Sequence, residues 1–175
     1  MSGGMDSAAC AFHLRAQGLV VEGLFVDHGQ AAAIQEARAV SAIAAQLDIP
    51  LRKISVGGMH ATGVGELTGR NAFLIFTALL ATQAKPGLLG LGLHAGTPYY
   101  DCSETFVAAI GRMVAEHTDG KVSVIVPFLT WAKKDVHDYF VSTGLSLSLT
   151  YSCEAGTDPV CGRCASCNDR KALRC

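Results

Sequence analysis

The sequence predicts an α/β fold: a doubly wound, mainly parallel sheet followed by a C-terminal zinc-binding segment. Three observations lead to this prediction. Short apolar runs alternate with segments of helical periodicity through the first 150 residues. A stretch rich in serine and glycine stands at the start of the chain, directly before a helical segment. Four cysteines fall within fifteen residues near the C-terminus.

The expected helices and strands follow one another in order along the chain. The strands are short apolar runs such as VVEGLFV and LLGLGL, and we expect them over residues 20–26, 51–55, 88–93 and 122–126. Helices are expected over residues 6–17, 31–46, 71–83, 103–116 and 133–142. Residues 56–69 contain five glycines and are expected to form a loop. We expect residues 1–150 to form the α/β domain and residues 151–175 to pack on it.

The composition fits one well-buried domain. The chain has 175 residues, of which 50% are hydrophobic and 17% charged, so it is too apolar to be disordered. A net charge of −1 gives no overall electrostatic case for binding nucleic acid or a membrane surface. No apolar run reaches the ~20 residues of a membrane span, and Asp6 stands where a signal peptide would be positive. We therefore expect a cytoplasmic protein without membrane contact.

The stretch SGGMDS at residues 2–7 has the composition of a phosphate-binding loop. Glycines let backbone amides approach an anion, serines add hydroxyl donors, and the following helix presents its positive end. No lysine follows the glycines, which distinguishes the stretch from a Walker-type loop. A flexible N-terminus is the alternative interpretation. The residues expected to bind pyrophosphate are Ser2, Gly3, Gly4, Met5, Asp6 and Ser7.

Polar residues also follow each of the predicted strands. The stretches are DHGQ (residues 27–30), GRN (69–71), HAGTPYYDC (94–102) and PFLTWAKKD (127–135). Taken alone, each stretch is more often a turn, a helix start or a solvated helix face than a functional site. The carboxyl ends of parallel strands meet at one edge of a sheet, and ligands bind there. Their shared location therefore favours a functional site.

Four cysteines near the C-terminus have the spacing of a metal site. Cys153, Cys161, Cys164 and Cys167 are arranged as C-x7-C-x2-C-x2-C, which lets four thiolates converge on one zinc ion. Free buried thiols and an iron–sulfur cluster are the alternatives. A zinc ion with four protein ligands has no open position for a substrate, so we expect a structural role.

Together the two ends of the chain resemble the 7-cyano-7-deazaguanine synthases of queuosine biosynthesis, which belong to the ATP pyrophosphatases. The resemblance runs through SGGMDS, DHGQ, GRN, HAGTPYYDCSETF, the Pro-x5-Lys-x-acid pattern of residues 127–135, and CGRCASCNDRKA. It implies an adenine nucleotide alpha hydrolase-like fold and a homodimer. It also implies that ATP, with Mg²⁺, adenylates the carboxylate of 7-carboxy-7-deazaguanine and that ammonia and a second ATP complete the nitrile.

The resemblance and the chemistry of the side chains suggest roles for the remaining residues. Bringing the substrate carboxylate next to the phosphates of ATP requires cations that screen the negative charges, and Arg70 and Lys133 are suitable. Asp6 or Asp27 is expected to help bind Mg²⁺, and Asn71 to contribute to the ATP site. Catalytic or substrate-facing positions are expected for Arg70, Lys133, Asp101 and His94.

Some positions depart from the pattern of the family. The segment HAGTPYYDCSETF is shorter than in the relatives, and Ser103 stands where they usually have arginine. A related enzyme fits these departures if it activates a different carboxylate, or transfers a deazaguanine to a protein or nucleic acid. The basic residues near the zinc segment would then form the contact surface: Arg163, Arg170, Lys171 and Arg174. A non-catalytic scaffold of the same fold is the third alternative.

The phosphate loop lacks its usual preceding strand in this sequence. In the family the loop follows the central strand, and only Met1 precedes it here. Removing a central strand would expose two rows of backbone donors and acceptors. We therefore expect that the natural chain begins upstream of Met1; otherwise the strand comes from another chain, or the sheet is reorganised.

Overall fold

A computed structural model describes residues 1–58, 65, 67–94 and 96–175. Half of the loop expected at residues 56–69 therefore lies outside the described residues, as does residue 95 in the HAGTPYYDC stretch. The helices are α1 (Met5–Ala16), α2 (Ala33–Gln46), α3 (Arg70–Thr82), α4 (Glu104–His117), α5 (Lys133–Ser142) and α6 (Ala165–Ala172). The strands are β1 (Gly23–Asp27), β2 (Leu51–Ser55), β3 (Gly87–Gly90) and β4 (Val122–Ile125), and two short 3-10 helices are η1 (Tyr100–Cys102) and η2 (Leu147–Leu149).

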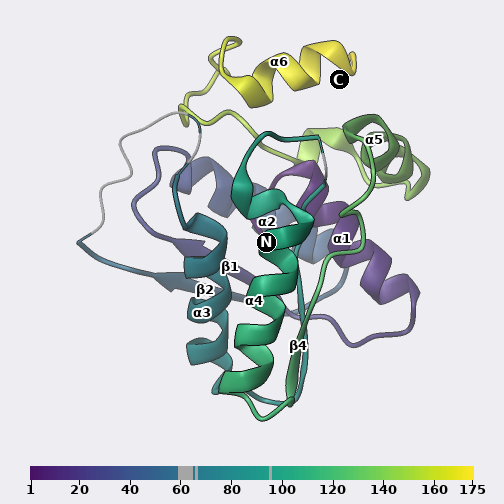
Figure 1. Cartoon of the computed structure of the whole chain (residues 1–175). Coiled ribbons are helices and arrows are strands. Elements are labelled where there is room, and N and C mark those ends of the chain that lie inside the picture. Colours follow the sequence, from purple (N-terminus) through teal and green to yellow (C-terminus); the bar gives the residue numbers. More distant parts are fainter. Residues whose placement is uncertain (59–64, 66, 95) are drawn as a thin grey trace.

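The strands form two parallel pairs. β1 pairs with β2 and β3 pairs with β4, in two separate two-stranded sheets (Figure 1). The α/β class with parallel strands is therefore confirmed, and the expected helices and strands are present with ends shifted by a few residues. β1 begins at Gly23 rather than at residue 20, because Val20 is fully exposed and has no neighbour to pair with in the described residues.

One edge of β1 has no strand beside it in the described part of the chain. The Gly23 N–H donates to the Pro50 carbonyl, and the Asp27 carbonyl accepts from the Val56 N–H, so both residues bond toward β2. Backbone groups of successive residues in a strand point to opposite sides, so those of Leu24 and Val26 point away from β2. The amino group of Met1 donates to the carbonyl of Leu24 on this side. The start of the chain thus lies along the open edge of β1.

Helices pack on both sides of the strands. One buried cluster joins α1 and α2 to α5, and includes Ala8, Ile43 and Phe140. A second joins α3 and α4 to the β3–β4 pair, and in Figure 1 these two helices run side by side across the front. None of the helices in the described ranges has the length and apolar character that a bilayer span requires.

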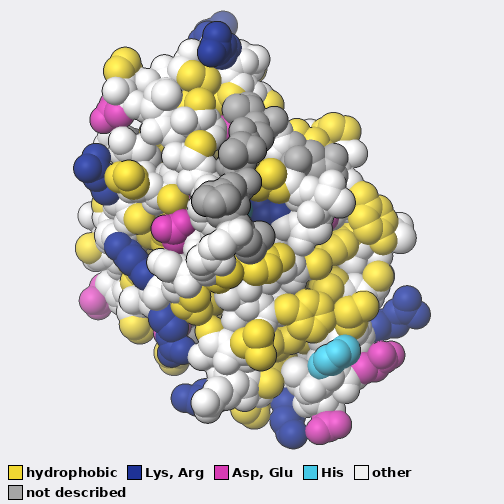
Figure 2. Space-filling view, turned by 90° about the vertical axis from the view of Figure 1, so that its left-hand side faces the viewer, with side chains coloured by type: hydrophobic (Ala, Val, Ile, Leu, Met, Phe, Trp, Pro, Cys, Tyr) yellow, Lys and Arg dark blue, Asp and Glu magenta, His cyan; other side chains and the backbone are white. Residues whose placement is uncertain are grey.

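Part of the surface remains apolar. Figure 2 shows hydrophobic side chains gathered on the lower part of the face that lies to the left in Figure 1. Exposed apolar side chains of the described residues include Leu80 of α3 and Leu88 of β3. Leu88 is half-exposed, and in the part of the chain that the structure describes β3 pairs only with β4.

The backbone at Gly3 passes very close to α2. Gly3 has a φ of +77°, and a β-carbon there would lie 2.8 Å from the carbonyl oxygen of Glu36 and 2.9 Å from the β-carbon of Ala39. Only glycine combines this left-handed conformation with so close an approach. The position of the loop before α1 is therefore fixed by its packing on α2.

Substitution of this glycine should cost more than conformational strain alone. We expect Gly3→Ala to lower the free energy of unfolding by about 2–4 kcal/mol, the sum of left-handed strain and an overpacked contact. Gly18→Ala is the matched control, since Gly18 has a φ of +82° and its β-carbon would meet nothing within 4 Å. Its loss should be about 1–2 kcal/mol, from strain alone. Equal losses for both variants in urea unfolding would contradict the packing argument.

Candidate functional site

The loop before α1 presents hydrogen-bond donors at the start of a helix. Gly4 is the N-cap of α1 and provides no side-chain cap, so the first-turn N–H groups have no acceptor within the helix. The Ser7 hydroxyl donates to the Gly4 carbonyl at 3.0 Å, and the Ser2 N–H donates to Ser7 Oγ at 3.2 Å. These bonds fold the loop around the helix start. The result is a set of backbone and hydroxyl donors suited to a phosphate group.

Three residues expected in the site meet beside this loop. Lys133, the first residue of α5, donates to both carboxylate oxygens of Asp6 at 2.8 and 2.6 Å. His94 Nε2 lies 3.9 Å from the nearer Asp6 oxygen. The backbone after β3 comes close enough that a β-carbon on Gly92 would lie 2.4 Å from the Asp6 carbonyl oxygen. The ends of three elements therefore bring Asp6, Lys133 and His94 together.

His94 is held as a neutral imidazole. The Gly96 N–H donates to His94 Nδ1 at 2.9 Å, which assigns the ring proton to Nε2 on the side of Asp6. Burial lowers the pKa of His94, the Asp6 carboxylate acts in the opposite direction, and Lys133 lowers it further. Near neutral pH the residue therefore provides a neutral N–H donor beside the carboxylate.

Asn71 and Asp101 form a second, buried group. The Asn71 N–H donates to Asp101 Oδ2 at 3.2 Å, and Asn71 Nδ2 donates to the Asp101 carbonyl at 2.9 Å. The sequence predicted separate ligands for these residues, ATP for one and the substrate base for the other. The structure brings them together, where they hold the start of α3 against η1. The exposed Arg70 is the first residue of the same helix.

Ser103 is engaged in capping α4. Its hydroxyl accepts from the Phe106 N–H at 3.1 Å and donates to the Tyr100 carbonyl at 2.7 Å. Asp27 likewise makes a local contact, since its carboxylate accepts from the Gly29 N–H at 3.0 Å. Within the described residues no hydrogen bond or ion pair links Asp27 to the group around Asp6. The predicted site residue Asp27 therefore does not join the group around Asp6.

Two residues that the sequence did not indicate lie beside the loop. Glu36 of α2 accepts from Gln30 Nε2 at 2.9 Å, and burial raises the pKa of Glu36 while this hydrogen bond lowers it. The Tyr151 N–H donates to the Gly3 carbonyl at 2.9 Å. Glu36 reads as an ordinary position in an amphipathic helix, and a backbone donor leaves no signal in a sequence.

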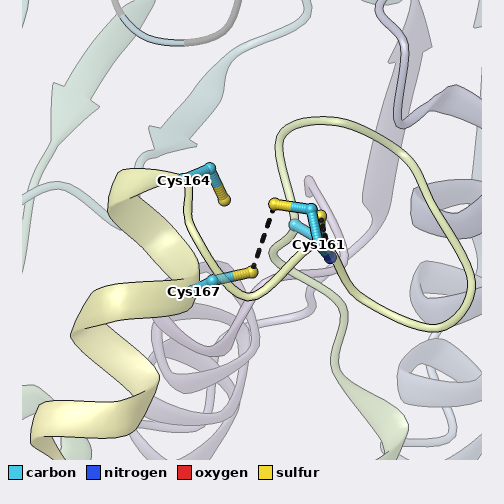
Figure 3. A group of neighbouring side chains, drawn as sticks. Cys161, Cys164 and Cys167 are labelled. Carbon is cyan, nitrogen blue, oxygen red and sulfur yellow. Dashed lines mark hydrogen bonds between the residues drawn. The ribbon is translucent and has the colours of Figure 1, made fainter.

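The four predicted cysteines converge at one point. The sulfurs of Cys153, Cys161, Cys164 and Cys167 all lie within 4.8 Å of one another. Figure 3 shows three of them approaching from the start of α6 and from the chain before it, with Cys161 and Cys167 Sγ 4.0 Å apart. Four sulfurs bound to one zinc at ~2.3 Å would be separated by ~3.8 Å, so a small contraction completes the tetrahedron. The cluster fits a four-coordinate metal ion such as zinc.

The surroundings of Cys153 favour the form that binds metal. Its side chain is fully buried, and burial acts to raise the pKa of the thiol. Hydrogen bonds from the Cys161 N–H, at 3.3 Å, and from Thr157 and Ala155 outweigh this and lower the pKa to about 5. These hydrogen bonds favour the thiolate form of Cys153, which is the state a zinc ligand requires.

Comparisons with known proteins agree along almost the whole chain. The sequence is 34% identical over 110 residues to a 7-cyano-7-deazaguanine synthase of Aquifex aeolicus, a match that covers 58% of this chain and 50% of that protein. It is 27% identical over 197 positions to the synthase of Haloarcula marismortui, covering 95% of this chain and 84% of the relative. For Campylobacter concisus the identity is 29% over 198 positions, with coverages of 97% and 89%.

The family described as "Queuosine biosynthesis protein QueC" matches residues 1–72 and 64–173. The first of these segments contains the phosphate loop and the GRN stretch. The second contains the His94, Lys133 and cysteine segments. Both parts of the site described above therefore lie in matched sequence, and the chain belongs to the QueC family.

Proposed function

We propose that this chain is an ATP-dependent ligase that converts 7-carboxy-7-deazaguanine and ammonia into 7-cyano-7-deazaguanine. The observation that carries this proposal is the donor-lined loop at the start of α1, with Asp6, Lys133 and His94 beside it. The membership in the QueC family and the names of the relatives support the choice of substrate and product.

The first step would be adenylation of the substrate carboxylate. A carboxylate oxygen attacks the α-phosphorus of ATP, and the bond to the β-phosphate breaks to release pyrophosphate. The first-turn N–H groups of α1 and the hydroxyls of Ser2 and Ser7 would hold the departing anion. Lys133 would turn from Asp6 to a phosphate oxygen, leaving Asp6 for Mg²⁺. Bound Mg²⁺ would neutralise part of the phosphate charge.

The later steps build the nitrile. Ammonia attacks the carbonyl carbon of the acyl adenylate, and AMP and a proton leave to give the amide. A second ATP adenylates the amide oxygen with loss of pyrophosphate, and loss of AMP and the remaining N–H protons leaves the carbon–nitrogen triple bond. We assign Asp101 and His94 to the deazaguanine ring. The N–H groups of the ring suit the Asp101 carboxylate as their acceptor. Arg70 would screen charge, and Asn71 and Asp27 would complete the ATP site.

A different carboxylate substrate is the second candidate. Ser103 is uncharged, so this position offers the substrate no cation, and its hydroxyl is already bonded to Phe106 and Tyr100. A substrate with less negative charge near η1 than 7-carboxy-7-deazaguanine would fit that arrangement. The chemistry of adenylation would be the same.

We also propose one structural zinc ion per chain, bound by Cys153, Cys161, Cys164 and Cys167. All four donors belong to the protein, so no coordination position remains for a substrate. The ion would hold residues 151–175 on the domain of residues 1–150. By the same family resemblance, we propose a homodimer that works in the cytoplasm.

Lys133 and Lys134 make a matched pair for testing the site. Lys133→Ala should slow AMP formation about 100-fold, because it removes the cation beside the phosphate loop. Lys134 is exposed and pairs with Asp138 on the surface of α5, so Lys134→Ala should keep the rate. AMP release by the two variants measures the difference. Similar rates in both would rule out Lys133 as a phosphate contact.

The substrate is tested by pyrophosphate release. We expect 7-carboxy-7-deazaguanine to stimulate release, and ammonium to add a product with the mass of the nitrile and a second pyrophosphate per substrate. Guanine and unrelated carboxylates serve as controls. Stimulation by another acid, with none by 7-carboxy-7-deazaguanine, would favour the second candidate.

The metal is tested by removing one ligand. Cys161→Ser and Cys164→Ser should bring zinc well below one ion per chain and lower the melting temperature by about 10 °C or more, since such sites contribute several kcal/mol to folding. Cys175→Ser is the control, because Cys175 is exposed and outside the cluster. Elemental analysis and thermal melts on the same samples give the answer. Unchanged zinc content in both ligand variants would disprove the site.

A further inference from the structure

Residues 150–152 contact both the phosphate loop and α6. The Tyr151 N–H donates to the Gly3 carbonyl at 2.9 Å, and a β-carbon on Gly4 would lie 3.7 Å from the Tyr151 carbonyl oxygen. The carbonyl of Gly3 and the N–H of Gly4 belong to the same planar peptide unit and point in opposite directions. The hydrogen bond from Tyr151 therefore helps to set the direction of the Gly4 N–H, which donates to Ser2 Oγ at 3.4 Å. A phosphate oxygen of ATP would replace the Ser2 hydroxyl as the acceptor of this N–H.

Arg170 of α6 contacts residues 150–152 on the side away from the phosphate loop. Its Nε donates to Ser152 Oγ at 2.8 Å, and a terminal nitrogen donates to Thr150 Oγ1. The two acceptors flank Tyr151, so one planar guanidinium fixes both sides of the residue that bonds to Gly3. None of the ion pairs among the described residues includes Arg170. Its donors are committed to the two hydroxyls rather than to a carboxylate.

The cysteine cluster holds both partners of this contact. Cys167 lies one helical turn before Arg170 on α6, and Cys153 directly follows Ser152. Both are buried, and their sulfurs belong to the same group of four. A metal ion on the four thiolates would thus fix the guanidinium and its acceptors with respect to each other.

We infer that Arg170 is a positioning residue for ATP, which transmits the order of the metal-binding segment to the phosphate loop. It holds Thr150 and Ser152 so that the Tyr151 N–H fixes the Gly3 carbonyl and aims the Gly4 N–H. Metal content and ATP affinity are coupled through this contact. The inference rests on the proposed function, in that the loop binds the phosphates of ATP.

Three variants test the contact. Arg170→Met keeps the length of the side chain and removes the donors, and Arg170→Lys keeps the charge without the planar fork. Arg174→Met is the control, since Arg174 is exposed near the end of the same segment. The probe is the non-cleavable analogue α,β-methylene-ATP, with its dissociation constant measured by calorimetry. Zinc content and the melting temperature are measured on the same samples.

We expect Arg170→Met to weaken analogue binding about 10-fold, which is the size expected for the loss of charged hydrogen bonds. The zinc content should stay at that of the unmodified chain. Arg170→Lys should recover part of the loss, and Arg174→Met should bind as before. Unchanged affinity in Arg170→Met would overturn the inference. A loss that appears only together with zinc loss would also overturn it, because Arg170 would then act through folding alone.

Two further measurements keep the test decisive. If Arg170→Met does not fold, Ser152→Ala removes one acceptor and should weaken binding about 3-fold with zinc retained; unchanged binding would refute the inference. Hydrogen exchange without any nucleotide should be faster at the Tyr151 amide in the Arg170 variants, and equal rates would count against the contact. If exchange responds but the unmodified chain releases no pyrophosphate, the proposed function fails and the contact stands.

Discussion

Gly3 lies between two close neighbours, and the geometry of the candidate site follows from that contact. α2 approaches so closely that a β-carbon would lie 2.8 Å from the Glu36 carbonyl oxygen, while the Tyr151 N–H bonds to the Gly3 carbonyl at 2.9 Å. α1 begins two residues later, so these contacts decide where its N-terminus points. Asp6 in the first turn then reaches Lys133 of α5. A helix start, a lysine from a distant element and a neutral histidine are thereby placed around one point.

The two groups of site residues are held in different ways. Asp6 and Lys133 are each about a quarter exposed, at 26%, and such pairs are weak enough to exchange partners when an anion arrives. Asn71 and Asp101 are buried and satisfied by each other, so breaking their contact would leave buried polar groups without partners. The first group can therefore rearrange around ATP, whereas the second keeps its position between α3 and η1.

The sequence was sufficient to predict most of the helices and strands and the four cysteines that cluster. Helix and strand positions follow from local periodicity, and the cysteine spacing needs only a short turn between ligands. The contacts between distant segments were not predicted: Asn71 and Asp101 lie 30 positions apart, and their bond depends on how α3 packs against η1. The predicted start of β1 at residue 20 was wrong, because strand pairing rather than composition decides where a strand begins. The role of Glu36 depends on its burial, and that of Tyr151 on its backbone N–H. Neither property can be predicted from the residue type.

The closeness of the four sulfurs has a consequence for redox chemistry. Cys161 and Cys167 Sγ are 4.0 Å apart, and a shift of about 2 Å would bring them to the bond length of a disulfide. Such a bond would remove two metal ligands at once, and a bound zinc ion would keep the same thiolates from reacting with one another. A reducing compartment would preserve the metal-binding state. With a metal ion on the four thiolates, the attachment of α6 to the rest of the chain would be sensitive to oxidants as well as to metal supply.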